Sequence, residues 1–232
     1  MIYFQIKYFH IDLSSLQSIN DFVDQLDVEN IDILINNAGL WGSPMDKSAD
    51  GLEITFATNY LSHFLLSNLL IKKYQLKKII NVSSGLYLQG KLDSADLLYL
   101  LDIPENANKK IYKQLYSTSK LAQIYHAKEL AVQYPEIFSC SLHPGLVYTD
   151  LARYVKPKSF FISVLAKFLP FIIRTPDEGA QTSVYCSVED GLQSGAYYGD
   201  CQMEKINDIA NDPLVQKKLW DFSTEVIQSK IK

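Results

Sequence analysis

Cysteine and long apolar segments are scarce in this chain. Its three cysteines, Cys140, Cys186 and Cys201, lie far apart and form no C-x-x-C pair. Neither a disulfide framework nor a zinc site is therefore expected, and a reducing compartment is predicted. The most apolar stretch, residues 160–173, contains a lysine and a proline and is shorter than the ~20 residues that span a bilayer. The first residues are too mixed in character for a signal peptide.

An excess of either charge is also absent. Lys and Arg number 22 against 26 Asp and Glu, a net charge of −4, which offers no electrostatic surface to nucleic acid. The four histidines, His10, His63, His126 and His143, lack metal-ligand spacing, so no metal site is expected. Apolar residues (47%) and aromatic residues (12%) are abundant, which excludes intrinsic disorder. Residues 1–232 are predicted to form one domain.

Segments typical of strands alternate with segments typical of helices. The predicted strands are residues 3–11, 31–35, 78–82, 138–142 and 196–198. The predicted helices are residues 16–26 after a cap at Ser14 or Ser15, 50–74, 112–134, 177–188 after a cap near Thr175, and 212–227. This alternation predicts an α/β protein with a doubly wound parallel sheet. Ligands of such sheets bind at the carboxyl ends of the strands, where residues 36–39, 83–84 and 144–145 would lie.

A tyrosine followed four positions later by a lysine places a phenol and an ammonium on one helix face. The pattern occurs five times: Tyr3/Lys7, Tyr74/Lys78, Tyr87/Lys91, Tyr116/Lys120 and Tyr154/Lys158. Context selects Tyr116/Lys120, because this pair opens a strong helix and follows a strand that ends at Ser83-Ser84. A phenol, with an ordinary pKa near ~10, becomes a useful acid–base group when a nearby ammonium lowers that pKa. A serine hydroxyl could hold a substrate carbonyl, although each residue taken singly also fits a solvated pair, a turn or a cap.

Taken in order, six motifs resemble the short-chain dehydrogenase/reductase family over nearly the whole chain. They are Asp12-Leu13-Ser14, Asn36-Asn37-Ala38-Gly39, Asn59 within its helix, Ser83-Ser84, Tyr116-Ser117-Thr118-Ser119-Lys120 and Pro144-Gly145-Leu146-Val147-Tyr148-Thr149. Further likeness to the retinol dehydrogenase-like and WW-domain oxidoreductase-like branch comes from His143-Pro144-Gly145, Glu178 to Ser183, Tyr197 to Cys201 and Lys218-Leu219-Trp220.

The resemblance implies a catalytic set of Ser84, Tyr116, Lys120 and Asn59. Tyr116 would be the general acid or base, Lys120 would lower its pKa and bind the nicotinamide ribose, and Ser84 would orient the substrate oxygen. Asn59 would hold a water that links Lys120 to solvent. The implied cofactor-binding residues are Asp12 (at the adenine), Asn36, Ala38, Gly39, Tyr116, Lys120, Pro144, Gly145, Val147 and Thr149 (at the carboxamide). His63 and His143 are expected to be structural, and a hydrolase pair of Ser84 with His143 is disfavoured because no G-x-S-x-G elbow occurs.

The family's Gly-rich turn, T-G-x-x-x-G-x-G, which cradles the cofactor pyrophosphate, does not occur in this sequence. The resemblance therefore implies a Rossmann-type sheet without its first two strands, and an incomplete dinucleotide-binding domain. In the family's strand order, 3-2-1-4-5-6-7, this separates residues 3–11 from residues 31–35 by about 14 Å. Either residues 3–11 move next to residues 31–35, or the edge of the latter stays unpaired. Weak dinucleotide binding is expected, and both a misassigned start codon and a splice form stay open.

The function implied is hydride transfer between a nicotinamide cofactor and an alcohol or carbonyl of an apolar, retinoid-, steroid- or lipid-like substrate. The cofactor is NAD or NADP; the branch favours NADP, but the residues that discriminate would follow the second strand. Residues 159–169 would be a flap over the substrate or would dip into a membrane surface, and their location favours the flap. The alternative function is a catalytically silent scaffold or truncated isoform that binds a protein partner. No nucleic-acid partner is expected. Peripheral membrane contact and homo-oligomerisation stay open, and the expected location is the cytoplasm or the cytosolic face of an internal membrane.

Overall fold

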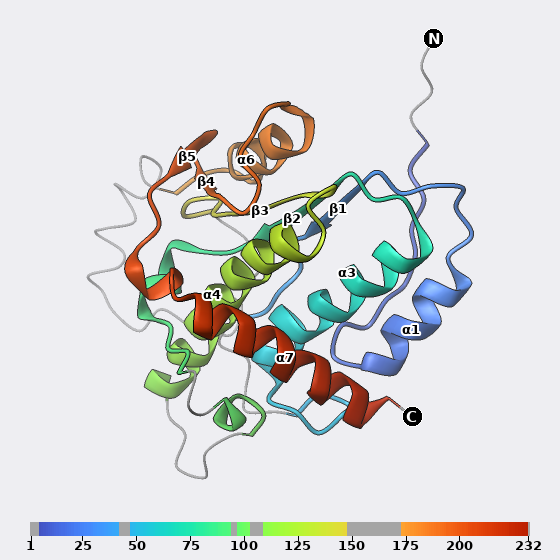
Figure 1. The fold of residues 1–232 in the computed structure, drawn as a ribbon, viewed down its shortest axis with the longest axis vertical. Coiled ribbons are helices and arrows are strands. Elements are labelled where there is room, and N and C mark those ends of the chain that lie inside the picture. The colour runs from blue at the N-terminus through green and yellow to red at the C-terminus, as the bar shows by residue number, and fades with distance from the viewer. Residues whose placement is uncertain (1–4, 42–46, 94–96, 103–108, 148–172, 232) are drawn as a thin grey trace.

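The computed structural model describes residues 5–41, 47–93, 97–102, 109–147 and 173–231 (Figure 1). One sheet has the strand order β1-β2-β3-β4-β5. The strands are β1 (Ile33–Asn36), β2 (Lys78–Val82), β3 (Phe138–Leu142), β4 (Tyr197–Gly199) and β5 (Gln202–Glu204). The first four strands run parallel, and β5 pairs antiparallel with β4. The predicted α/β class with a Rossmann-type parallel sheet is confirmed.

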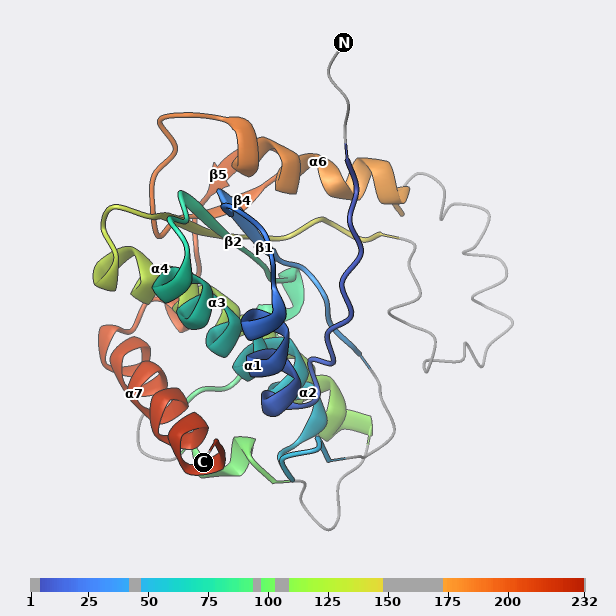
Figure 2. The same cartoon turned by 90° about the vertical axis from the view of Figure 1, so that its right-hand side faces the viewer.

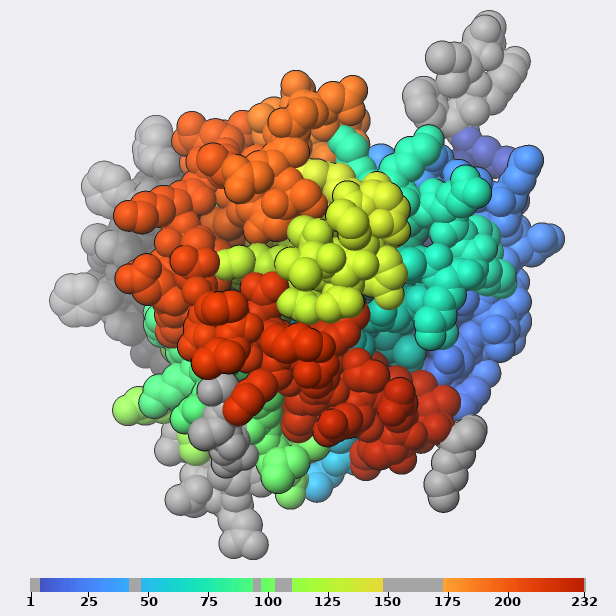
Figure 3. All heavy atoms as spheres, in the orientation of Figure 1, coloured from blue at the N-terminus to red at the C-terminus, as the bar shows by residue number. Residues whose placement is uncertain are grey.

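Helices cover both faces of the sheet, as the alternating pattern predicts (Figure 2). α3 (Ser62–Lys73), α4 (Lys109–Gln133) and α7 (Pro213–Lys230) lie on one face, with α1 (Leu16–Gln25) packed against α3. α6 (Pro176–Val188) lies on the other face. Successive side chains of β2 alternate between the two layers: Ile79 packs into the larger core, and Ile80 and Val82 pack with Cys186 of α6. Figure 3 shows α7, in red, lying across the face of the molecule seen in Figure 1.

Side chains cap the starts of three helices, and the caps at Ser15 and Thr175 were predicted from the sequence. Ser15 accepts a hydrogen bond from the Ser18 amide at the start of α1. Thr175 and Glu178 form a reciprocal capping box at the start of α6. At α7 the Asp212 carboxylate accepts from two backbone amides of the first turn. These local signals place the three helix starts within one residue of their predicted positions.

The helix predicted over residues 50–74 begins later and is interrupted. It consists of α2 (Ile54–Phe56), a wide π-helical turn (Ala57–Leu61) and α3. The Glu53 carboxylate caps it by accepting from the amides of Thr55 and Phe56, at 2.8 and 2.7 Å. Asp50, the predicted start, instead accepts a hydrogen bond from the Leu16 amide at the start of α1, so its cap serves a different helix.

The strand predicted over residues 3–11 is wrong for the part that the structure describes, because residues 5–11 form no strand. Ile6 and Tyr8 are exposed, and Phe9 contacts Phe22 of α1 edge-on at 6.4 Å between ring centroids. Within the described ranges β1 therefore keeps one unpaired edge, as the second of the two expected outcomes requires. A strand needs a neighbouring strand to satisfy its backbone, and residues 5–11 have none.

The strand β5 was not predicted from the sequence. It follows β4 through the two-residue turn Asp200-Cys201, in which both residues have positive φ, at 50° and 57°. Such a turn matches the twist of a tight antiparallel hairpin. The hairpin returns Glu204 to the carboxyl edge of β3, where it meets His143.

Candidate active site

Three of the predicted catalytic residues meet at the carboxyl edge of β2. Lys120 and Tyr116 come from α4, and Ser84 follows the strand. The Lys120 ammonium donates to the Val82 carbonyl at 2.9 Å and lies 5.8 Å from the centroid of the Tyr116 ring. The Ser84 hydroxyl lies beside the Tyr116 phenol and lowers the pKa of that phenol. The structure therefore brings together the phenol, the amine and the hydroxyl that the sequence singled out.

The two adjacent serines have different partners. The Ser83 hydroxyl donates to the Lys120 carbonyl at 2.7 Å, and the Ser83 amide donates to Leu142, so this serine ties β2 to α4 and β3. Ser84 caps the short 3-10 helix of residues Gly85–Gln89, and its hydroxyl accepts from the Leu86 amide at 3.2 Å. Only Ser84 is placed beside the phenol of Tyr116, as predicted.

The electrostatics differ from the expectation at Tyr116. Burial raises the pKa of the Tyr116 phenol, and the hydrogen bond from Ser84 partly offsets this. Burial also lowers the pKa of Lys120 to about 8. The expectation that Lys120 lowers the pKa of Tyr116 is wrong for this structure. The ammonium bonds the Val82 carbonyl and lies beside the phenol ring.

Asn59 lies fully buried in the π-helical turn and clamps the chain beside it. Its side-chain oxygen accepts from the Leu40 amide at 2.8 Å, and its side-chain nitrogen donates to the Leu40 carbonyl at 3.0 Å and to the Ser119 hydroxyl at 3.1 Å. A Cβ atom at Gly39 would lie 3.1 Å from the Asn59 oxygen and 3.6 Å from the Lys120 nitrogen. Gly39 therefore permits a close backbone approach to both groups.

Gln123 and His63 belong to the same buried network, and the sequence reasoning missed Gln123. Its amide nitrogen donates to the Asn59 carbonyl and lies 2.6 Å from Nδ1 of His63. Burial, together with the nearby Lys120 charge, lowers the pKa of His63 to about 3, so its ring is neutral and can accept this hydrogen bond. Gln123 lies one helical turn after Lys120, but a polar residue inside a helix is ordinarily exposed, so the sequence does not indicate its burial.

Two of the predicted cofactor-binding side chains are engaged elsewhere, and Ala38 is exposed. The Asp12 carboxylate accepts from the amide and hydroxyl of Ser14, at 2.9 and 2.7 Å, and these bonds lower its pKa. The Asn36 amide donates to Ser67 at 3.0 Å and to Asn81 at 2.8 Å, which ties β1 to α3 and β2. Within the described ranges, no hydrogen bond joins Asp12 to the residues around Lys120, and its role at an adenine stays a prediction.

The segment after β3 turns sharply. Gly145 has a φ of +78°, a region that favours glycine. The Arg174 guanidinium lies against it and donates to the Pro144 carbonyl at 3.2 Å. Val147 forms a parallel bridge with Arg174, which returns the chain toward α6. Two predictions lie outside the described residues: Thr149, and the flap at residues 159–169.

Two general properties of the described residues bear on the class of site. No group of three His, Cys, Asp or Glu side chains in the described ranges is placed to hold a metal ion. Within the same ranges, every helix is too short or too polar to cross a membrane.

A Rossmann-type parallel sheet with a serine, a tyrosine and a lysine gathered at its carboxyl edge defines the class of dehydrogenase-like folds. The model of the family described as short chain dehydrogenase matches residues 2–93. Mouse retinol dehydrogenase 14 is 39% identical over 231 residues, 94% of this chain and 66% of that protein. Mouse retinol dehydrogenase 11 is 34% identical over 228 residues, 94% of this chain and 68% of that protein. The chain belongs to the short-chain dehydrogenase/reductase family.

The solved structures agree with this assignment. A crystal structure of an uncharacterized protein from Mycobacterium paratuberculosis is 26% identical, with a TM-score of 0.71, over 94% of this chain and 74% of that chain. The chain spans just under two thirds of the length of retinol dehydrogenase 14 from mouse and human, at 66% and 65%.

Proposed function

We propose that this chain carries the catalytic residues of an oxidoreductase that moves a hydride between a nicotinamide cofactor and the carbonyl or alcohol group of a small molecule. One observation carries the proposal: the Ser84 hydroxyl and the buried Lys120 ammonium both lie beside the Tyr116 phenol. The names of the related retinol dehydrogenases support the same reaction class.

In carbonyl reduction, Tyr116 would donate its phenolic proton to the substrate oxygen as negative charge develops there. Ser84 would hold the same oxygen through its hydroxyl and so stabilise that charge. Because burial raises the pKa of Tyr116, the phenol keeps its proton at neutral pH until a substrate oxygen accepts it.

The residues around Lys120 fit the nicotinamide and ribose end of the cofactor. The ammonium has three N–H donors, and the Val82 carbonyl takes one of them within the described part of the chain. The remaining donors suit ribose hydroxyls, and Gly39 leaves its side of the lysine open to close approach. When bound, the nicotinamide supplies or accepts the hydride. The pyrophosphate turn is not among these 232 residues, so we expect weak binding of NADP, the cofactor that the branch favours, and of NAD.

The substrate proposed is an apolar carbonyl or alcohol compound of retinoid, steroid or lipid type. Leu88 and Leu146 expose 53% and 58% of their surface near the carboxyl edge, and the ring of Trp41 lies 5.6 Å from that of Tyr116. These side chains would contact apolar parts of a ligand. Peripheral membrane contact, oligomeric state and cellular location stay predictions.

Reduction of retinal by millimolar NADPH tests the proposal, measured with the 232-residue chain and with a chimera that adds the matching N-terminal segment of mouse retinol dehydrogenase 14. Tyr116→Phe should lower turnover at least about 100-fold, because it removes the acid. Tyr185→Phe, the same change in α6, is the matched control and should retain turnover. Equal turnover in Tyr116→Phe and Tyr185→Phe would contradict the proposed acid.

A further inference from the structure

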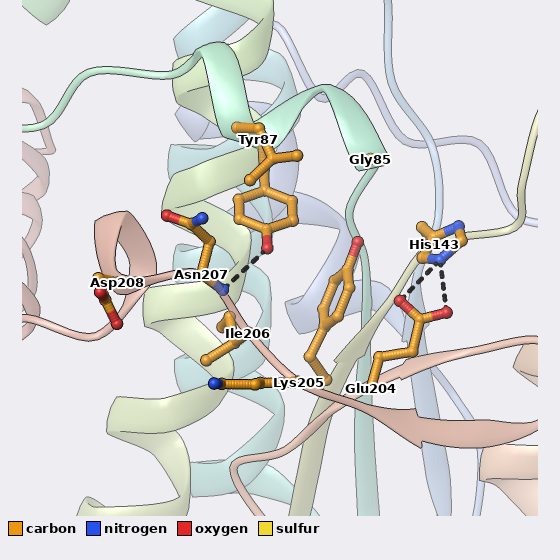
Figure 4. A pocket seen from close by; sticks show the side chains of 10 residues that line it. Gly85, Tyr87, His143, Glu204, Lys205, Ile206, Asn207 and Asp208 are labelled. Atoms are coloured by element: carbon orange, nitrogen blue, oxygen red, sulfur yellow. Dashed lines mark hydrogen bonds and ion pairs between the residues drawn. The ribbon is translucent and has the colours of Figure 1, made fainter.

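A cavity of about 500 Å³ opens one residue beyond Ser84 (Figure 4). Its walls come from the 3-10 helix after β2, the end of β3, the β4–β5 hairpin and the segment that follows it. The lining residues are Gly85, Tyr87, Leu88, His143, Tyr197, Glu204, Lys205, Ile206, Asn207 and Asp208. A volume of this size suits a small organic ligand, and the position adjoins the serine proposed to hold the reacting oxygen.

Two tyrosine hydroxyls at this cavity have protons to donate. Tyr197 is 4% exposed, and its hydroxyl has no hydrogen-bond partner among the described residues. Tyr87 is 5% exposed, and its oxygen accepts from the Asn207 amide at 3.2 Å, which leaves its own proton available. The two rings meet edge to face, 5.4 Å apart between centroids. Burial raises the pKa of the Tyr197 phenol, so this group remains a protonated donor.

An unpaired buried hydroxyl destabilises a protein relative to phenylalanine at the same position, because the hydroxyl loses its water without gaining a partner. Nothing in the packing of Tyr197 uses this oxygen. Its ring alone stacks on His143, at 5.6 Å between centroids, and contacts Tyr87. A ligand that reaches this hydroxyl and accepts its proton would satisfy it.

His143 and Glu204 form the fixed wall behind Tyr197, and this gives His143 a place that the sequence reasoning did not foresee. Nδ1 of His143 accepts from the Gly145 amide at 3.2 Å, so in the neutral ring Nε2 carries the proton. Nε2 lies 3.1 and 3.2 Å from the two carboxylate oxygens of Glu204 (Figure 4). A Cβ atom at Gly199 would overlap both partners, so glycine at this position leaves room for the pair.

The charges around the cavity restrict the kind of ligand. Two carboxylates, Glu204 and Asp208, line it together with one ammonium, that of Lys205. This net negative lining disfavours an anionic group, while the two phenols offer hydrogen bonds to an oxygen acceptor. A neutral carbonyl or hydroxyl group satisfies both conditions.

We propose that this cavity is a substrate subsite that binds a second, neutral oxygen group, remote from the reacting carbonyl, through the hydroxyls of Tyr87 and Tyr197. The inference rests on the proposed function and deepens it. It assigns the enzyme to substrates that are apolar in the middle and oxygenated at both ends, such as hydroxyketones and diketones.

The test compares two neutral ketones that differ in one distal oxygen, 2-decalone and decalin-2,6-dione. Binding to the full chain is measured by saturation-transfer NMR without cofactor, and reduction is measured with NADPH. The dione should bind about 10-fold more tightly to the wild type, as one buried hydrogen bond allows. In Tyr197→Phe the preference should fall to twofold, the statistical advantage of two equivalent carbonyls. Tyr185→Phe, outside the cavity, should keep the 10-fold preference.

A thermal unfolding measurement on the unliganded protein accompanies the binding test. Tyr197→Phe should leave the midpoint unchanged or raise it by about 2 °C, since an unpaired buried hydroxyl is removed. A fall of more than about 4 °C would show that this hydroxyl has a structural partner and would overturn the inference.

The outcomes separate the subsite from the proposed function. If the wild type reduces both ketones but binds them equally, or if the dione preference persists in Tyr197→Phe, the subsite is wrong and the oxidoreductase proposal stands. If the wild type neither binds nor reduces either ketone, both fail. A 10-fold preference that Tyr197→Phe abolishes supports the subsite even where reduction is too slow to measure.

Discussion

Lys120→Met is expected to change the pH dependence of stability, because the buried ammonium destabilises the unliganded fold. Burial lowers the pKa of Lys120 from 10.5 to about 8. Each pKa unit corresponds to 1.36 kcal/mol, so keeping this amine charged destabilises the folded state by about 3 kcal/mol at neutral pH. Between pH 8 and pH 10.5 the unfolded chain holds the proton that the folded chain has released. The free energy of unfolding of the wild type therefore rises with pH across this window, relative to a variant without the amine.

Urea unfolding of the wild type and Lys120→Met at pH 7.5, 9 and 10.5 measures this effect. Between the lowest and the highest pH, the free energy of unfolding of the wild type should rise by about 3 kcal/mol relative to that of the variant. Loss of the hydrogen bond to the Val82 carbonyl changes the free energy of unfolding of the variant by a similar amount at every pH. The test is therefore the slope of the free energy of unfolding against pH. The exposed Lys72 supplies the control, Lys72→Met, which should show no such slope. A difference between wild type and Lys120→Met that stays constant within about 1 kcal/mol would refute the reasoning.

Two further predictions concern the clamp at Asn59 and the open edge of β1. Asn59→Ala should lower the free energy of unfolding by about 2–4 kcal/mol, because it leaves the partly buried amide and carbonyl of Leu40 without this partner. Asn68→Ala, which loses a bond to the Phe64 carbonyl at 2.8 Å and a long one from Tyr134 at 3.5 Å, should cost less than about 1 kcal/mol, and equal effects in denaturant titrations would contradict the clamp. Ile35→Lys, at a position 42% exposed on the unpaired edge, should reduce self-association in light scattering with little change in stability, and unchanged association would show that this edge is not the adhesive surface.

The two central strands could be predicted to the residue, and the first predicted strand could not. β2 and β3 are short segments whose carboxyl ends are marked by Ser83-Ser84 and by His143-Pro144-Gly145, so these limits are local properties of the chain. Whether residues 5–11 form a strand depends on a pairing partner distant in sequence, and composition carries no information about that partner. The same reason explains β5, whose three residues gain their strand structure only from pairing with β4.

The residues of the candidate active site also divide into those that could be predicted from the sequence and those that could not. Tyr116 and Lys120 could be selected from five equivalent pairs, because the position of a strand end and of a helix start is readable in sequence. Gln123 could not be selected from the sequence, since a polar residue inside a helix is ordinarily exposed, and this one is fully buried. The direction of the pKa shift at Tyr116 was missed for another reason. It depends on how deeply the fold buries the phenol, which the sequence does not show.

The wide turn at Ala57–Leu61 makes the number of residues in this stretch as important as their identity. Each residue of an ordinary helix advances the chain by about 100° around the axis. The π-helical turn holds one residue more than an α-turn would, and this sets the rotation of everything that follows in α3 relative to Asn59. Deleting a single residue here would turn either the amide away from Leu40 or the apolar side of α3 away from the sheet. Evolution can therefore vary side chains along this helix far more freely than it can gain or lose a position.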